Sequence, residues 1–189
     1  MYNYIFYLLF IMQNVFGFNI LIKNELKNIK NLLVNQQNNR YQNFDRSENY
    51  LLTAENMLSK YIDKKYCLGV NSGGMAITLS LIAIKKLYNL LDNSIVFSNS
   101  FTFNAVPSAI VNANFKPVFV ETDKHLLIDL DDLELKIQKY KCKKNVLVLS
   151  YMRGRIPNMD KVLKLCNKYN IIMLEDAAHA YGCMWNKKK

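Results

Sequence analysis

The sequence predicts an α/β fold, a three-layer α/β/α arrangement built on a mostly parallel sheet. From residue 47 onward, short apolar stretches alternate with longer segments of helical periodicity. The short stretches are unbroken apolar runs, as expected for strands of a parallel sheet that is covered on both faces. With 189 residues, of which 51% are hydrophobic and 21% charged, the chain is long enough for one sizeable domain with a buried core.

The first elements follow from a cap, an apolar run and a glycine turn. Ser47 can cap a helix that runs to residue 61 with an apolar face. Residues 66–71 (YCLGVN) are expected to form a short buried strand. A Ser-Gly-Gly turn at 72–74 then leads into a strongly apolar helix over 75–90.

The middle of the chain alternates in the same way. Residues 94–98 predict a strand, 104–111 a helix and 117–121 a strand. Asp129 is placed to cap a helix that carries Leu130, Leu133 and Ile137.

The last elements complete the alternation. Residues 145–149 predict a strand, and Pro157 marks the start of a helix that ends near residue 169. Residues 171–175 predict a further strand. Ligands of such folds bind where parallel strands end, so the residues after each strand are the candidates for function.

The net charge of +10 does not indicate a nucleic-acid or membrane partner. It comes from 21 Lys and only four Arg, in a chain that also holds 24 Asn. Arginine is the residue that makes bidentate contacts to phosphates and bases, and it is the scarce one. We therefore interpret the charge as a solvated surface.

The cysteines predict neither a disulfide framework nor a metal site. They are widely spaced, without a CxxC pair, and two histidines cannot complete a zinc-binding spacing. Reduced and mostly buried thiols are expected. The residues concerned are Cys67, Cys142, Cys166, Cys183, His125 and His179.

Residues 1–15 form an apolar leader ahead of the domain at 16–189. The apolar run at 4–12 is too short to span a bilayer and is followed by Gln13 and Asn14. It lacks a preceding basic residue and a following A-x-A site, which a signal peptide would have. A disordered or mis-started leader on a cytoplasmic protein is the favoured interpretation, with secretion as the alternative.

The turn Ser72-Gly73-Gly74 is the first strand end with unusual chemistry. Two glycines let a ligand approach the backbone, and the first turn of a helix attracts an anion such as phosphate. Ordinary turn chemistry explains the same residues.

The run Ser-Phe-Thr-Phe at 100–103 is the second. It places aromatic rings and hydroxyls at the same edge of the sheet, although an aromatic core cluster is the preferred interpretation of these residues taken alone.

The run Glu-Asp-Ala-Ala-His-Ala at 175–180 is the third. Two adjacent carboxylates at the end of a buried strand are costly unless cations or hydrogen-bond donors match them. Asp176 is either a helix N-cap or a carboxylate that pairs with the ring nitrogen of a ligand.

Together these segments resemble the DegT/DnrJ/StrS sugar aminotransferases, which depend on pyridoxal phosphate and have the fold-type-I architecture. The resemblance rests on 69–76 (GVNSGGMA), 100–105 (SFTFNA), 113–121 (ANFKPVFVE) and 174–180 (LEDAAHA). It extends from about residue 16 to the last residue, and it includes Phe16 to Phe18, Glu25 and 40–44 near the start.

The resemblance implies a role for several residues. Ser72, Gly73 and Gly74 would hold the cofactor phosphate, although the family usually has Thr at the position of Gly74. Phe103 would stack on the pyridine ring. Asp176 would pair with the pyridinium nitrogen, which keeps the ring able to accept electrons, and His179 would lie near the phenolic oxygen.

The resemblance also implies a reaction and a missing part. Relatives transfer an amino group from an amino acid, typically glutamate, to a nucleotide-linked keto sugar, and they act as homodimers. Their Schiff-base lysine lies downstream of the Glu-Asp-Ala-Ala run, beyond Lys189, so the chain is expected to be an amino-terminal part of the large domain, inactive alone. None of Lys187, Lys188 and Lys189 is assigned that role.

Several alternatives stay open on the sequence. A sugar dehydratase of the same family has His in place of the lysine, and a non-catalytic remnant or binding protein would need no lysine. Ser72, with Asp123 or Asp129 and His179, follows the order of a serine hydrolase, but Val70 stands where the nucleophile turn needs glycine. Arg153 and Arg155 are either contacts to a substrate phosphate or surface residues.

Overall fold

A computed structural model describes residues 50–140 and 144–187 of the chain. The expected leader at 1–15, the cap Ser47 and the family-like residues at 16–18, 25 and 40–44 lie outside these ranges. The chain divides into two compact units at residues 69 and 70. Each unit is described by itself.

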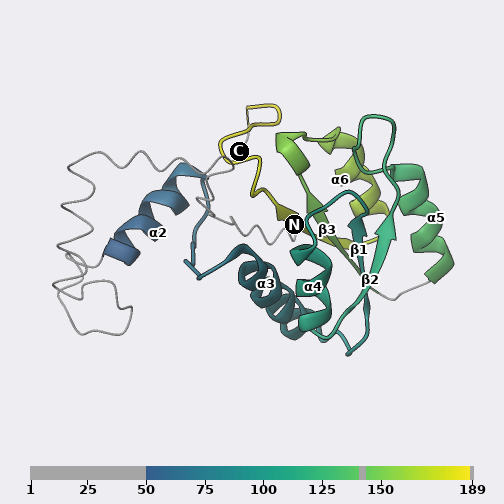
Figure 1. The fold of residues 1–189 in the computed structure, drawn as a ribbon, viewed down its shortest axis with the longest axis horizontal. Helices are drawn as coiled ribbons and strands as arrows, with labels where there is room; N and C mark the ends of the chain where they lie inside the picture. Colours follow the sequence, from purple (N-terminus) through teal and green to yellow (C-terminus); the bar gives the residue numbers. More distant parts are fainter. Residues whose placement is uncertain (1–49, 141–143, 188–189) are drawn as a thin grey trace. The chain divides into compact units, whose positions relative to one another are not determined.

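The larger unit is a four-stranded parallel sheet with helices between its strands (Figure 1). The strand order is β2-β1-β3-β4, and every neighbouring pair is parallel. The predicted fold class is therefore confirmed. The strands are β1 (Ile95–Asn99), β2 (Lys116–Val120), β3 (Asn145–Ser150) and β4 (Ile171–Asp176); the helices are α3 (Gly73–Tyr88), α4 (Ala105–Asn112), α5 (Leu130–Tyr140) and α6 (Met159–Lys168).

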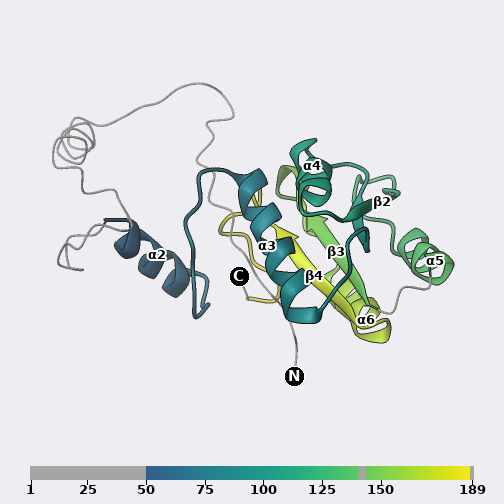
Figure 2. The same cartoon turned by 90° about the horizontal axis from the view of Figure 1, so that it is seen from below.

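Helices cover both faces of the sheet, with α3 and α4 on one side and α5 and α6 on the other (Figure 2). Side chains alternate between the faces along each strand. Thus Val148 and Leu174 pack with α3 and α4, whereas Leu147 and Met173 pack with α5 and α6. We call these the α3–α4 face and the α5–α6 face.

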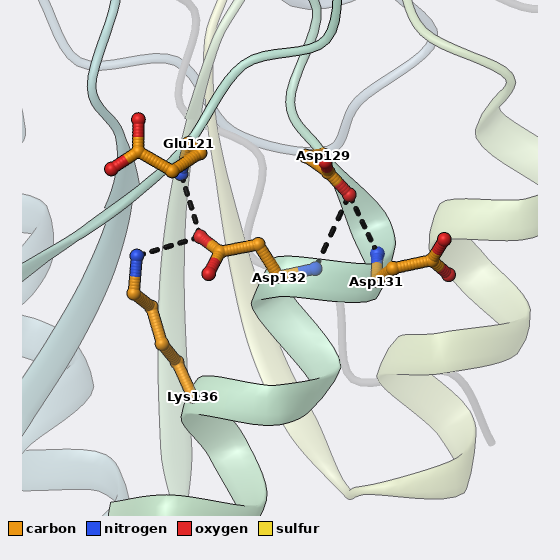
Figure 3. A network of polar contacts seen from close by, with 5 residues as sticks. All are labelled: Glu121, Asp129, Asp131, Asp132 and Lys136. Carbon is orange, nitrogen blue, oxygen red and sulfur yellow. Dashed lines mark hydrogen bonds and ion pairs between the residues drawn. The ribbon is translucent and has the colours of Figure 1, made fainter.

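The first turn of α5 is capped and tied to the end of β2 (Figure 3). Asp129 Oδ1 accepts hydrogen bonds from the backbone N–H groups of Asp131 (2.9 Å) and Asp132 (3.2 Å), as the predicted cap requires. Asp132 Oδ2 accepts from Glu121 N at 2.7 Å and from Lys136 Nζ at 2.6 Å. A single carboxylate thus holds the residue after β2 against α5.

The boundaries predicted for the helices and strands of this unit differ from those of the structure by at most two residues. One difference has a clear local cause. Asn158, not Pro157, precedes the first turn of α6, and its side chain accepts from Lys161 N at 3.1 Å. Proline lacks the N–H of the first turn but offers no oxygen acceptor, so the cap belongs to the asparagine.

The smaller unit contains α2 (Tyr50–Tyr61) within the described residues 50–69. Here the prediction of a buried strand at 66–71 is wrong: no strand forms there, and Tyr66 and Leu68 are 76% and 56% exposed. A strand needs a neighbour for its backbone groups. In the described part of the chain none pairs with this segment, and Gly69 N donates instead to Glu55 Oε1 at 2.5 Å.

The expectation of mostly buried thiols is also wrong for the described cysteines. Cys166 is buried, Cys67 is partly exposed and Cys183 is exposed, and all three are free thiols. Cys142 lies outside the described residues. Cysteine has no fixed place in the apolar pattern, so its burial depends on the face of the element that it occupies.

Candidate functional site

The amino terminus of α3 is built by Ser72. Its backbone is extended (φ −161°, ψ 161°), and its Oγ accepts from Met75 N at 3.2 Å. The N–H groups of the first helical turn have no partner within a helix and point along its axis. Gly73 and Gly74 therefore occupy a position where an anion is favoured by hydrogen bonding and by the helix dipole.

Gly74 is not required by packing. A Cβ built on it would lie 3.9 Å from Ala105 Cβ, which is ordinary van der Waals contact. The same distance shows that the first turn of α3 lies against the first turn of α4. It therefore brings the Ser72–Gly74 turn close to the segment that precedes α4.

That segment carries Phe103, which is 61% exposed. Its carbonyl accepts from Val106 N at 2.9 Å, which places the residue at the entrance to α4. An aromatic core cluster is therefore the wrong interpretation for Phe103. A large apolar ring exposed beside a helix amino terminus is available to a flat ligand.

Asp176 ends β4 on the α3–α4 face, two residues after Leu174. The residue is only 8% exposed. Oδ2 accepts from Ser150 Oγ at 3.0 Å, and Oδ1 accepts from Ala178 N at 3.2 Å. The N-cap interpretation is wrong, because no helix begins at Asp176 and its carboxylate closes a turn instead.

Ser150 connects Asp176 to the end of β1. Ser150 Oγ accepts from Thr102 Oγ1 at 2.8 Å. Its backbone is held by Asn99, whose Oδ1 accepts from Ser150 N at 3.0 Å and whose Nδ2 donates to Ser150 O at 3.2 Å. The ends of β1, β3 and β4 are thus joined by buried polar contacts.

Glu175 lies on the opposite, α5–α6 face. It accepts a hydrogen bond from the hydroxyl of Tyr151, which packs in the apolar cluster of that face. Burial, and then the negative charge of Glu175, raise the pKa of the Tyr151 phenol far above its usual range. The same two causes raise the pKa of the buried Cys166 thiol to about 12.

His179 is exposed and held by the loop that follows β3. Its Nδ1 accepts from Arg153 N at 3.1 Å. Arg153 and Gly154 both have positive φ, of 57° and 72°, and a Cβ on Gly154 would lie 3.0 Å from the carbonyl oxygen of His179. A backbone N–H can only donate, so the neutral imidazole carries its hydrogen on Nε2.

The groups proposed for a serine hydrolase are engaged elsewhere. Ser72 caps α3, and His179 accepts from the Arg153 backbone. Asp123 Oδ1 accepts from the backbone of the residues that follow it, at 2.8 Å and 3.0 Å, and Asp129 caps α5. These contacts do not assemble a catalytic triad.

The two arginines after β3 lie at the surface. Both side chains are exposed, and Arg155 Nη1 donates to His125 O at 2.9 Å. Among the residues that the structure describes, no group of three or more His, Cys, Asp and Glu side chains could hold a metal ion, and no helix is long and apolar enough to cross a membrane.

The structure places the sequence-predicted residues at one edge of the larger unit. The proximity of Gly74 to Ala105 and the chain of bonds from Thr102 to Asp176 bring together three of the predicted segments. Ser150 and Asn99 were not among the site residues predicted from the sequence. Each is a polar residue at the end of an apolar strand, so the strand-end criterion that selected Asp176 could have found both.

Two known proteins with named aminotransferase activities are similar to this chain. The chain is 30% identical over 135 residues to the dTDP-3-amino-3,6-dideoxy-α-D-galactopyranose transaminase of Aneurinibacillus thermoaerophilus, covering 71% of this chain and 36% of that protein. It is 30% identical over 134 residues to the 3-oxo-glucose-6-phosphate:glutamate aminotransferase of Bacillus subtilis, covering 70% and 29%.

A solved structure shows the shared fold. The GDP-4-keto-6-deoxy-D-mannose-3-dehydratase of Escherichia coli, with bound hydrated PLP, superposes with a TM-score of 0.76 at 20% identity over 91% of this chain and 42% of that one. The chain spans about a third of the length of the curated relatives that it matches. Residues 21–189 match the family model, and the chain belongs to the DegT/DnrJ/EryC1/StrS aminotransferase family.

Proposed function

We propose that this chain supplies the cofactor-binding edge of a pyridoxal-phosphate-dependent sugar aminotransferase. Its amino donor would be an amino acid, with glutamate as the first candidate, and its acceptor a nucleotide-linked keto sugar. The single observation that carries the proposal is the buried Asp176 carboxylate, which lies at the same sheet edge as the α3 amino terminus and the exposed Phe103 ring. The name of the Aneurinibacillus thermoaerophilus relative, which contains a dTDP-linked sugar, supports the acceptor. The name of the Bacillus subtilis relative supports glutamate as the donor, although its acceptor is a sugar phosphate.

The residues present fit this cofactor. Gly73 and Gly74 in the first turn of α3 suit its phosphate, and Phe103 offers an exposed ring face. An ionised carboxylate has about four lone-pair positions. The side chain of Asp176 accepts from Ser150 and Ala178, which leaves capacity for a protonated ring nitrogen.

Each residue would act by binding, orienting or holding a proton. When bound, the cofactor supplies an electron-accepting ring for the cleavage of bonds to the amino-bearing carbon. Asp176 would hold the proton on the ring nitrogen, and Phe103 would fix the ring plane. His179, with its hydrogen on Nε2, would donate to the phenolic oxygen.

The family resemblance also bears on the Schiff base, the assembly and the domain division of the enzyme. We assign the role of the Schiff-base lysine to no residue of this chain. All contacts proposed here are non-covalent, so a dissociation constant of about micromolar to millimolar is expected. We also propose that two copies of the chain assemble and that the protein is cytoplasmic. Residues 1–15 would form a leader, and residues 16–189 would be part of the large domain.

The direct test is a binding titration with pyridoxal phosphate and, separately, inorganic phosphate. Asp176→Asn should weaken pyridoxal phosphate about 10- to 100-fold, because a hydrogen bond between charged groups is lost. It should leave the affinity for inorganic phosphate unchanged. Asp131→Asn is the matched control, since that residue is exposed on α5.

Two results would contradict the proposal. One is the absence of saturable pyridoxal phosphate binding by the unchanged chain. The other is equal affinity of the Asp176→Asn variant and the unchanged chain. Borohydride reduction of the complex should leave no pyridoxyl group on a specific lysine, because no covalent contact is proposed.

A further inference from the structure

The hydroxyls of Thr102 and Ser150 form a short chain of hydrogen bonds that ends on Asp176. Thr102 Oγ1 lies 2.8 Å from Ser150 Oγ, which lies 3.0 Å from Asp176 Oδ2. Ser150 is 6% exposed and Asp176 8% exposed, so their hydrogen bond is screened from water, whereas Thr102 is partly exposed. We call Thr102 and Ser150 the hydroxyl relay.

The direction of the relay is fixed by elementary chemistry. An ionised carboxylate can only accept, so the single hydrogen of Ser150 Oγ must point at Asp176. Ser150 then has only lone pairs left for Thr102, which must donate its own hydrogen. In a buried setting such aligned hydroxyls strengthen each other.

The relay is also braced through the backbone. The Asn99 side chain exchanges two hydrogen bonds with the backbone of Ser150 and donates a third to Phe101 O at 2.9 Å. It thus fixes Ser150 and the segment that carries Thr102. The Asn99 side chain thus links the end of β1 to the end of β3, and the hydroxyl relay links the end of β3 to the end of β4.

We infer that Thr102 and Ser150 are positioning residues that orient the Asp176 carboxylate toward a cationic ring N–H. With Oδ2 held by Ser150 and Oδ1 by Ala178 N, the carboxylate cannot rotate freely, and its remaining lone pairs keep one direction. The relay therefore discriminates between ligands with and without a protonated ring nitrogen. This inference rests on the proposed function, which identifies that ligand as pyridoxal phosphate.

The test compares paired variants against three ligands. Ser150→Ala removes the donor to Asp176, and Thr102→Val removes the donor to Ser150 with little change in shape. Thr102→Ser keeps the hydroxyl and is the conservative counterpart. Ser108→Ala is the control, because its hydroxyl is exposed on α4 and bonds only locally to Asn104 O at 3.0 Å.

The ligands are pyridoxal phosphate, its deaza analogue with carbon in place of the ring nitrogen, and inorganic phosphate. Ser150→Ala should weaken pyridoxal phosphate about 10-fold and Thr102→Val about 3-fold. Both should leave the other two ligands unchanged. Ser150→Ala combined with Asp176→Asn should bind no more weakly than Asp176→Asn alone, because the relay acts through that carboxylate.

A measurement on the chain without ligand separates this inference from the proposed function. The Ala178 N–H is held by Asp176 Oδ1, so its hydrogen exchange reports on the order of the carboxylate. Exchange should be about 10-fold faster in Ser150→Ala and unchanged in Ser108→Ala and Thr102→Ser.

The two proposals can therefore fail independently. Unchanged Ala178 exchange in a folded Ser150→Ala variant overturns the relay whether or not pyridoxal phosphate binds. So does equal weakening of all three ligands. Absence of pyridoxal phosphate binding by the unchanged chain, with Ala178 exchange accelerated as expected, overturns the proposed function and the ligand direction but leaves the relay as the device that orders Asp176.

Discussion

Glu175 and Asp176 are neighbours in sequence, yet they lie on opposite faces of the sheet. Asp176 lies on the α3–α4 face and accepts hydrogen bonds from the Ser150 hydroxyl and from the Ala178 backbone N–H at the candidate site. Glu175 lies on the α5–α6 face and meets the phenol of Tyr151 beside a buried thiol. We propose a ligand-binding role for the Asp176 carboxylate, whereas the Glu175 carboxylate joins the core to a strand end.

The same contrast holds between Ser150, the last residue of β3, and Tyr151, which follows it. Ser150 is directly opposite Asp176 in the register of β3 and β4, and Tyr151 N donates to Asp176 O at 3.0 Å. The two strand ends therefore form two side-chain pairs, one on each face. Polar groups at a strand end can serve either binding or stability, and the face decides which.

The largest expected difference concerns thiol reactivity on the α5–α6 face. At pH 8 a thiol whose pKa is about 12 is ionised about a thousandfold less than an ordinary one, and only the thiolate reacts. We expect iodoacetamide to modify the exposed Cys183 at an ordinary rate and Cys166 on the order of a thousandfold more slowly. Mass spectrometry of quenched samples measures both rates.

Unfolding provides the control for this measurement. In concentrated urea both thiols should react at similar rates, because the cause of the difference is burial beside Glu175. Fast modification of Cys166 in the folded chain would show that the α5–α6 face opens to solvent.

In the middle of the sheet, substitutions on the two faces should lower the free energy of unfolding by similar amounts. Met173 and Leu174 are each 1% exposed, on the α5–α6 and α3–α4 faces respectively. Met173→Ala and Leu174→Ala should each lower the free energy of unfolding by about 2–5 kcal/mol, measured by urea denaturation. A large loss in only one variant would show that the two layers do not share one cooperative core.

At the strand ends, substitutions on the two faces should have different effects on stability and on ligand affinity. Tyr151→Phe removes the donor to Glu175 and should lower the free energy of unfolding by about 1–2 kcal/mol. It should leave pyridoxal phosphate affinity unchanged, because the pair lies on the face away from the site. Ser150→Ala also removes a donor to a buried carboxylate, but it should in addition weaken pyridoxal phosphate binding, so ligand affinity distinguishes the two neighbouring substitutions.

The smallest expected effect is a pH dependence that originates in the first turn of α5. Partial burial of Asp132 acts to raise its pKa, but the hydrogen bonds from Lys136 and Glu121 N outweigh it, and the pKa lies below its ordinary value of 3.8. The stabilisation is therefore complete above pH 3.8 and is lost as the pH falls through the folded-state value.

Asp132→Asn should consequently cost about 0.5–1 kcal/mol at pH 7 and less near pH 3. Denaturant titrations at the two pH values measure the difference. Asp131→Asn is again the control, because Asp131 belongs to the same turn but its side chain points away from this network (Figure 3). A cost that is the same at both pH values would mean that the ion pair and the β2 contact do not stabilise the ionised form.

Much of the fold was predictable because its information is local. The parallel strands appear as apolar runs, and Asp129 is recognisable as a helix cap. The strand expected at 66–71 failed for the opposite reason. Its apolar residues satisfy the local pattern, but a strand also requires a neighbour, which a local pattern does not contain.

The residues of the candidate site also differ in whether the sequence predicts them. Ser72, Phe103, Asp176 and His179 could be named from the chain, because each follows a strand or begins a helix. Their partners could not. Thr102 and Ser150 are 48 residues apart and Ser150 and Asp176 are 26 apart, and they meet only because β1, β3 and β4 align in one register.

The alternation of strands and helices and the chemistry at each strand end can be predicted from the sequence, since both depend on neighbouring residues. The packing of distant elements was needed to show that Asp176 faces α3 and α4 while Glu175 faces Tyr151, and that Ser150 is the donor to Asp176. The physical reason is that a side chain alternates faces with every residue of a strand. Which face is the site then depends on where distant helices pack.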